Sequence, residues 1–244
     1  MLFPKSLTKE KEMGRKPNTR LQIIQLGARL FIEEGYTATT VGKIGRMLGL
    51  STGNITFYFP TKDHLLAVLV DELIDFQNLL MEHATEEGQS SLLAYCLELT
   101  SIAAACEESE VVRDFYASTY SIPYTLDLIR SADTEKTRAV FGEFCPEKDD
   151  EWWRATENIV SGIEYATIMT REEDIPLPLQ IERTLSTILT IYGVPEEIRK
   201  KKIEKVLAMD YRGLGRRILS EFREYIERVN EENLKNFARK RKKR

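Results

Sequence analysis

The sequence is poor in cysteine, and its few cysteines form no recognisable motif. The chain of 244 residues contains 3 of them, Cys96, Cys106 and Cys145. They give neither a CxxC pair nor an even set, which argues against a disulfide framework and fits a reducing cytoplasm. We expect each to be a small buried side chain rather than a reactive thiol.

Histidine is equally scarce, with 2 in the chain. His64 has no ligating partner three or four residues away, and Glu82 and Glu86 beside His83 are typical of a solvated acidic face. The GxSxG, P-loop and GxGxxG signatures are also absent. The sequence therefore predicts a protein that is not an enzyme, with no catalytic residues, no cofactor and no metal site.

Long apolar runs are missing too. The longest is Leu65–Val70, far shorter than the roughly 20 residues that a membrane-spanning helix needs. The first residues, MLFPKSLTKEKEMGRK, lack the apolar core of a secretion signal. We therefore expect a cytoplasmic protein with no membrane partner.

The formal net charge is only −4, but charge is unevenly distributed along the chain. Residues 1–62 carry a net charge of +6, residues 63–198 of −20 and residues 199–244 of +10. A basic head on an acidic body predicts a polyanionic partner for the head alone, because the body would repel it.

Apolar residues recur at helical spacing, and no run alternates as a half-buried strand would. Proline and glycine punctuate the helical stretches. The sequence therefore predicts an all-α protein, with a small basic N-terminal unit and a larger helical body. In the body, we expect helices over 90–106, 109–121, 124–131, 134–143, 149–170, 178–192, 196–208 and 213–240.

The N-terminal unit contains a regular series of helix start and stop signals. A helix cap is available at Asn18 or Thr19, at Thr39 or Thr40, at Ser51 and at Thr61, and Gly35 and Gly49 are placed to end helices. The short helix after Thr40, the turn at Gly49 and the short helix after Ser51 make a helix-turn-helix, whose second helix enters the DNA major groove.

The composition of that second helix supports this interpretation. The run Ile55–Phe59 is β-branched or aromatic, which is unusual for a helix. Ile55 and Phe59 are expected to face inward and hold the helix. The outward residues offer hydrogen-bonding groups and flat rings to base edges; they are Thr52, Gly53, Asn54, Thr56, Phe57 and Tyr58. The alternative is a helical hairpin that only packs in a protein core. Such a hairpin would need neither the two helix caps nor a mixture of polar and aromatic side chains on the exposed side.

Residues 19–66 resemble the DNA-binding domain of the TetR family of transcriptional regulators. The spacing holds without a gap over the matched positions, which are Ala28, Phe31, Gly35, Tyr36, Thr40, Val41, Ile44, Gly49, Leu50, Ser51, Gly53, Ile55, Phe59, Lys62 and Leu65. The resemblance implies a three-helix DNA-binding domain over 18–63 and a helical ligand-binding and dimerisation domain over 64–237. Flexible and basic tails are expected at 1–17 and 238–244.

The resemblance also implies residue roles. Thr40 and Lys62 would bind phosphates on either side of the recognition helix, and Thr52, Gly53, Asn54, Thr56 and Phe57 would face the groove. Thr56 stands where the family usually has a tyrosine that reaches the backbone. Either Tyr58 supplies that hydroxyl or the contact is absent. Gly45 replaces the usual alanine, which weakens its helix by about 1 kcal/mol.

Regulators of this kind bind as dimers to two-fold related half-sites about one helical turn apart. In the family, two late helices of the body pair with their mates. The corresponding stretches here are 151–170 and 178–192, although a stripe of the same kind would also suit the core of one chain. The expected contact residues are Ile159, Gly162, Ile163, Ala166, Ile181, Leu185 and Ile188.

The family binds a small effector in the body, and residues 92–153 are rich in rings. Aromatic walls with hydroxyl tips suit an apolar or cationic ligand, although rings at helical spacing also occur in plain cores. The candidate residues are Tyr95, Phe115, Tyr116, Tyr120, Tyr124, Trp152 and Trp153. We therefore expect a repressor that binds a palindromic operator as a homodimer and is released by an effector. The alternative is a DNA-binding regulator that has no effector or that activates transcription.

Overall fold

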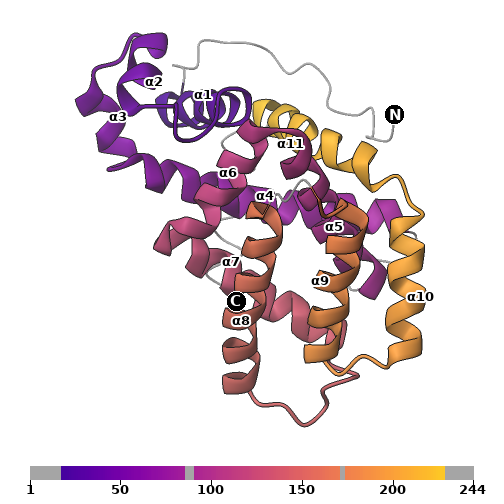
Figure 1. Cartoon of the computed structure of the whole chain (residues 1–244). Helices are drawn as coiled ribbons and strands as arrows, with labels where there is room; N and C mark the ends of the chain where they lie inside the picture. Colours follow the sequence, from indigo (N-terminus) through magenta and orange to yellow (C-terminus); the bar gives the residue numbers. More distant parts are fainter. Residues whose placement is uncertain (1–17, 86–90, 171–173, 229–244) are drawn as a thin grey trace, which may run out of the picture.

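The computed structural model describes residues 18–85, 91–170 and 174–228 (Figure 1). Within these ranges the chain forms eleven helices and no strand, so the all-α prediction is confirmed. The helices are α1 (Thr19–Glu33), α2 (Val41–Leu48), α3 (Thr52–Tyr58), α4 (Lys62–Thr85), α5 (Leu92–Glu108), α6 (Glu110–Ser121), α7 (Pro123–Phe141), α8 (Asp150–Met169), α9 (Leu177–Ile191), α10 (Glu196–Leu207) and α11 (Tyr211–Arg228). The tails predicted at 1–17 and 238–244 lie outside the described residues.

Helix α4 connects the small N-terminal unit, α1 to α3, with the body. Its apolar stripe, which includes Leu65, Leu69 and Leu73, is buried. One part of the helix packs on α1, and the rest packs on α5 and α7. Figure 1 shows α4 leaving the end of α3 and crossing the body. A shift of this helix would therefore move the N-terminal unit and the body relative to each other.

Helix α5 forms the centre of the body. Nearly all of its side chains are buried, because the sequence Leu92–Cys106 is apolar or small around the whole helix. It packs against α4, α6, α8, α9, α10 and α11. The small residues Ala103, Ala104 and Ala105 let neighbouring helices approach closely.

Helix α7 differs from the prediction of two short helices at 124–131 and 134–143. It is one continuous helix that starts at Pro123, where a proline is well tolerated. No glycine or proline lies inside it. The hydroxyls of Thr134 and Thr137 donate to the carbonyls of Arg130 and Asp133, so both hydroxyls find hydrogen-bond partners within the helix.

Helix α11 fastens the N-terminal unit to the body. It packs against α5 on one side and against α1 on the other (Figure 1). The Gln25 amide donates to the carbonyls of Ile226 and Glu227, at 3.3 and 3.1 Å, and Arg223 pairs with Glu33 at 2.6 Å. Helix α11 therefore covers both the body and α1.

A search of the described ranges for membrane-spanning segments finds no helix with the necessary length and apolar composition.

Candidate DNA-binding interface

The turn between α2 and α3 is built by local sequence signals. Thr40 caps α2 by accepting a hydrogen bond from the Lys43 amide, and Ser51 caps α3 by accepting one from the Asn54 amide. Between them, Gly49 adopts φ +67°, a left-handed conformation that costs a glycine little. Asn18 caps α1 in the same way. These caps and the glycine turn were predicted from the sequence and are confirmed.

Helix α3 has one buried side and one exposed side. Ile55 and the flanking Phe59 are buried in the core, as predicted. Phe57 is 81% exposed. A large apolar ring that is exposed to this extent often contacts a binding partner. Thr52, Gly53 and Asn54 are exposed, while Thr56 is partly buried, with its hydroxyl donating to the Gly53 carbonyl at 3.2 Å, and Tyr58 is 38% exposed.

The Asn54 side chain is held in a defined orientation. The Ser51 hydroxyl donates to Asn54 Oδ1 at 2.6 Å while it accepts from the Asn54 amide at 3.2 Å. The carboxamide therefore keeps its NH₂ group and one lone pair of Oδ1 for an outside partner. Asparagine uses this pair of groups to recognise the edge of adenine in the major groove.

The two predicted phosphate contacts lie in different environments. Thr40 is exposed at the start of α2. Lys62 is half-buried, and its Nζ donates to the carbonyls of Tyr36 and Thr39, at 2.8 and 2.9 Å, so one of its three N–H groups is left for a phosphate. Burial lowers the pKa of this ammonium group.

Two contacts that join the N-terminal unit to the body were not predicted. The Tyr36 hydroxyl donates to Asp63 at the start of α4. The amide and hydroxyl of Thr37 both donate to Asp114 of α6. These partners are 27 and 77 residues apart, and no local pattern in the sequence marks such pairs. Together they hold the turn before α2 against α4 and α6.

The structure does not gather the seven predicted effector residues around one pocket. Phe115, Tyr116 and Trp153 are buried in the core, and Tyr124 is 56% exposed. Trp152 is partly buried and packs edge-on against Trp153. The remaining two, Tyr95 and Tyr120, both donate to the Glu164 carboxylate, at 3.0 and 3.2 Å.

The cavities beside these tyrosines are small. One of about 50 Å³ is lined by Tyr116 and Tyr120, and one of about 40 Å³ by Tyr95 and Tyr120. Pockets for organic ligands usually measure ≈ 300–1,000 Å³. In this conformation the two cavities have room for ions and waters but not for an organic molecule.

Three carboxyls that were not predicted from the sequence lie beside these cavities; Glu157 and Glu164 are buried, and Asp133 is partly buried. Asp133, Glu157 and Glu164 place carboxylate oxygens within 4.8 Å of one another. Burial, and after it the charge of the nearby Asp133, raises the pKa of the Glu157 carboxyl to about 9 and that of Glu164 to about 8. No sequence spacing reveals the group, because it joins one residue of α7 to two residues of α8.

These raised pKa values predict that the chain loses stability as the pH rises. A carboxyl of pKa 4.5 in the unfolded chain and about 8 or 9 in the folded chain favours folding in its protonated form. The stabilisation of the folded chain by these protonated carboxyls is fully present below about pH 4.5 and is lost as the pH rises towards 9. Urea unfolding in a metal chelator should give a free energy that falls from pH 6 to pH 9. Glu157→Gln should reduce that fall by about 1.4 kcal/mol or more, the equivalent of one pKa unit.

The control for this experiment is Glu151→Gln, which neutralises an exposed carboxyl on the same helix. It should leave the pH profile of the wild-type chain unchanged. Identical profiles for Glu157→Gln and the wild type would show that Glu157 is charged throughout this range.

The predicted dimer residues divide between the surface and the core. On α8, Ile159 is 61% exposed, Gly162 and Ala166 are exposed, and Ile163 is partly buried. The three predicted residues of α9 correct the expectation, because all are buried within the protomer itself; they are Ile181, Leu185 and Ile188. The apolar stripe of α9 therefore belongs to the core of one chain, which was the alternative that the sequence left open.

The capped α2, the glycine turn and the exposed face of α3 define a helix-turn-helix DNA-binding protein. Residues 23–69 match the family model described as "Bacterial regulatory proteins, tetR family". Residues 23–69 are therefore a helix-turn-helix domain of the TetR family of transcriptional regulators, as the sequence resemblance implied. The family consists of regulators, which agrees with the prediction that the protein is not an enzyme.

Curated relatives support this assignment over part of the chain. It is similar to the uncharacterised HTH-type regulator YuxN of Bacillus subtilis (strain 168), with 27% identity over 45% of this chain and 38% of the relative. It is also similar to HbdR of Aromatoleum sp. (strain CIB), with 30% identity over 50% and 54%. QacR of Staphylococcus aureus (strain Mu50 / ATCC 700699) is 35% identical over 22% and 29%. The chain thus spans about half or less of the length of these relatives.

Solved structures of similar helical proteins were also found. A gamma-butyrolactone receptor (ArpA-like protein) aligns with a TM-score of 0.43 and 18% identity, over 83% of this chain and 97% of that one. AmtR of Mycobacterium smegmatis aligns with a TM-score of 0.39 and 18% identity, over 81% and 99%.

Proposed function

We propose that the protein is a repressor that binds a palindromic operator as a homodimer and is released when the body binds an effector. The observation that carries the proposal is the exposed face of α3, where Asn54 is oriented and Phe57 is largely uncovered. A protein that regulates transcription acts on the chromosome, so we infer a cytoplasmic location.

The DNA-binding part of the proposal is supported by the chemistry of α2 and α3. Asn54 offers a donor and an acceptor to a base edge, and the Phe57 ring suits a thymine methyl. Thr40 at the exposed start of α2 supplies a hydroxyl at the position where a helix attracts phosphate. The net charge of +6 over residues 1–62 favours approach to DNA.

A selection of random DNA duplexes with the purified full-length protein tests this function. We expect enrichment of an inverted repeat whose half-site centres are about 34 Å, one helical turn, apart. Run-off transcription from a template that carries the site should then fall when the protein is added. Enrichment of no site, or of a single unrepeated half-site, would contradict the proposal, and increased transcription would support the activator alternative.

The dimer is supported by exposed apolar side chains on the outer side of α8 and the start of α9. Ile159, Met169, Ile175 and Leu179 are 36–61% exposed. Figure 1 shows α8 and α9 lying side by side, as their contacts also indicate. The apolar stripe of α9 is buried inside the protomer. We therefore propose that the α8 face, the exposed side of α8 that carries Ile159 and Met169, makes most of the contact between the two chains.

Introducing a charge on this face is expected to break the dimer. Ile159→Glu should raise the dimer dissociation constant by about tenfold or more, because the carboxylate would be buried without a partner. Light scattering after size exclusion measures the mass. The matched control is Leu79→Glu on α4, where an apolar side chain is 52% exposed. Equal dimer stability in the two variants would show that the α8 face does not form the interface.

The route from body to DNA runs through α4 in this proposal. The N-terminal unit is joined to α4 by Lys62 and Tyr36 and to α6 by Thr37. An effector that moves α4 or α6 would therefore change the separation of the two α3 helices in the dimer. A coupling of roughly 1–3 kcal/mol is enough for 5–150-fold regulation.

The second candidate function is a DNA-binding regulator with no organic effector, and the small cavities of the body favour it. Tryptophan fluorescence distinguishes the two, because Trp152 and Trp153 pack against Tyr192 in the body. A change on addition of an organic molecule that also weakens operator binding would support the effector. A response to no member of a broad panel would support the second candidate.

A further inference from the structure

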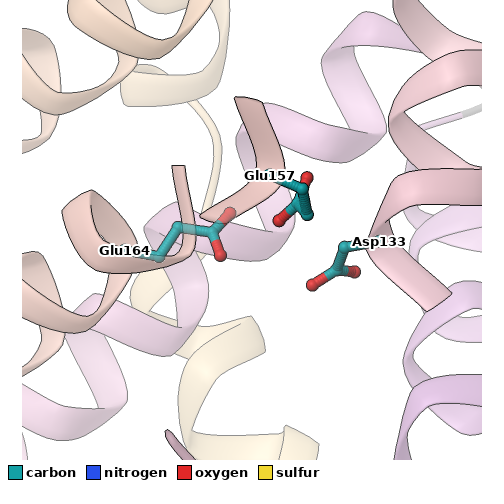
Figure 2. A group of neighbouring side chains, drawn as sticks. All are labelled: Asp133, Glu157 and Glu164. Carbon is teal, nitrogen blue, oxygen red and sulfur yellow. The ribbon is translucent and has the colours of Figure 1, made fainter. Parts of the chain in front are cut away.

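We propose that Asp133, Glu157 and Glu164 form a binding site for one hard divalent cation of the Mg²⁺, Mn²⁺ or Ca²⁺ class. The three carboxyls come from two adjacent helices, α7 and α8, and Figure 2 shows their oxygens turned towards a common space. This assignment does not depend on the proposed function, because it concerns ion binding alone.

The charge balance of the region calls for a cation. Four carboxyls lie together here, those of Glu98, Asp133, Glu157 and Glu164, and Lys136 is the ammonium group that lines the same cavity. Lys136 pairs with Glu98. The other three carboxyls are then left close together in a buried place, where uncompensated negative charge is very costly.

Glu157 gives an independent sign of a missing partner. Its side chain is buried, with 1% relative exposure, and Oε2 accepts a hydrogen bond from the Tyr192 hydroxyl at 3.2 Å. Its other oxygen, Oε1, is buried and has no hydrogen-bond partner. A proton on Oε1 would have no acceptor to donate to, whereas a cation would bind this oxygen directly. A buried oxygen without a hydrogen-bond partner, such as Oε1, is uncommon in proteins.

Protonation and cation binding are the two ways to relieve the same cost. The charged forms of carboxyls crowded in a region of low dielectric are unfavourable without a counter-charge, and the three carboxyls offer oxygens within 4.8 Å of one another. The groups that face them from neighbouring helices are Tyr95 and Glu98 of α5, Tyr120 of α6, Lys136 of α7 and Tyr192 after α9. Lys136, which pairs with Glu98, is the positive charge among these groups, and Arg130 of α7 lies nearby, with its Nε donating to the Ser161 hydroxyl of α8 at 2.9 Å.

The geometry identifies the kind of cation. Carboxylate oxygens within 4.8 Å of one another suit an ion bound at 2.0–2.6 Å, because oxygens on opposite sides of such an ion are about 4–5 Å apart. An all-oxygen donor set suits Mg²⁺, Ca²⁺ and Mn²⁺ rather than metals that prefer nitrogen or sulfur. The adjacent cavity of about 40 Å³, lined by Asp133 and Glu164, has room for water ligands but not for an organic amine.

Manganese binding to the full-length protein tests the site. Protein stripped with a chelator is titrated with Mn²⁺ at pH 8, and the loss of the free-ion signal in electron paramagnetic resonance gives the bound fraction. We expect one tightly bound ion per chain and a higher melting temperature in its presence. Mg²⁺ and Ca²⁺ should compete for the same site.

Two isosteric variants locate the ion, and one variant serves as the control. Glu157→Gln and Asp133→Asn should each weaken Mn²⁺ binding at least tenfold and remove the rise in melting temperature. Glu151→Gln, an exposed position on α8, should bind as the wild type does. Circular dichroism in chelator verifies that all the variants fold.

Two results would overturn the assignment. One is wild-type protein that binds none of the three ions at millimolar concentration. The other is equal Mn²⁺ affinity in the wild type and both isosteric variants, which would place the ion elsewhere. A separate calorimetric titration uses putrescine, an organic diamine. Protein that binds putrescine but none of the three metal ions would equally refute a metal site.

Discussion

Removing the Asn54 and Phe57 side chains together is expected to weaken specific operator binding by about 30-fold or more. Each well-placed contact with a base edge contributes about 1–3 kcal/mol of discrimination, so the loss of two such contacts costs about 2–6 kcal/mol, a factor of roughly 30 to 10⁴ in affinity. Asn54 is exposed and oriented by Ser51, and Phe57 is 81% exposed, so neither truncation opens the core. The fold should remain intact.

Binding of the double variant Asn54→Ala/Phe57→Ala is measured by mobility shift on the selected operator and on a scrambled duplex. The operator affinity should fall towards the scrambled value, which should change little because phosphate contacts dominate non-specific binding. Leu79→Ala is the control, since it also removes an exposed apolar side chain, on α4. Equal losses on both duplexes would mean that α3 contributes no base recognition.

Gly215→Ala is expected to destabilise the protein although alanine is the better helix former. A Cβ at this position of α11 would lie 2.4 Å from the Ser101 carbonyl oxygen and 3.3 Å from the Ala105 amide nitrogen, both in the backbone of α5. Backbone atoms of a central helix cannot rotate away, so the two helices must separate. We expect the free energy of unfolding to fall by about 1–3 kcal/mol, the usual cost of overpacking.

Gly42→Ala in α2 provides the matched comparison, because its new Cβ would meet only the end of the flexible Arg46 side chain, at 3.8 Å. That variant should gain up to about 1 kcal/mol from helix propensity. Urea unfolding followed by circular dichroism gives both values. A Gly215→Ala chain as stable as the Gly42→Ala chain would show that α5 and α11 tolerate a wider separation.

The N-terminal unit was predictable because its signals are local. Asn18, Thr40 and Ser51 cap helices within three residues of themselves, and Gly49 marks the turn by its backbone conformation alone. Ile55 and Phe59 were identified as inward by their spacing. Such features depend on neighbours in sequence, so the sequence is enough to recognise them.

The body was less predictable because its important contacts join distant residues. The stripe of Ile181, Leu185 and Ile188 suited a dimer surface as well as a core, and the packing of α5, α8 and α10 on α9 decided between the two. The carboxyls of Asp133 and Glu157 meet because α7 and α8 lie side by side. No periodicity within either helix reveals that meeting.

The docking of α11 on α1 also has a consequence for biosynthesis. The hydrogen bonds from Gln25 to Ile226 and Glu227 span 201 and 202 residues, so they cannot form until the chain up to Glu227 has left the ribosome. Contacts between parts so remote in sequence are slow to form during folding. We expect a nascent chain that ends before residue 211 to expose the apolar side of α1 to water, and therefore to need chaperone protection until α11 has left the ribosome.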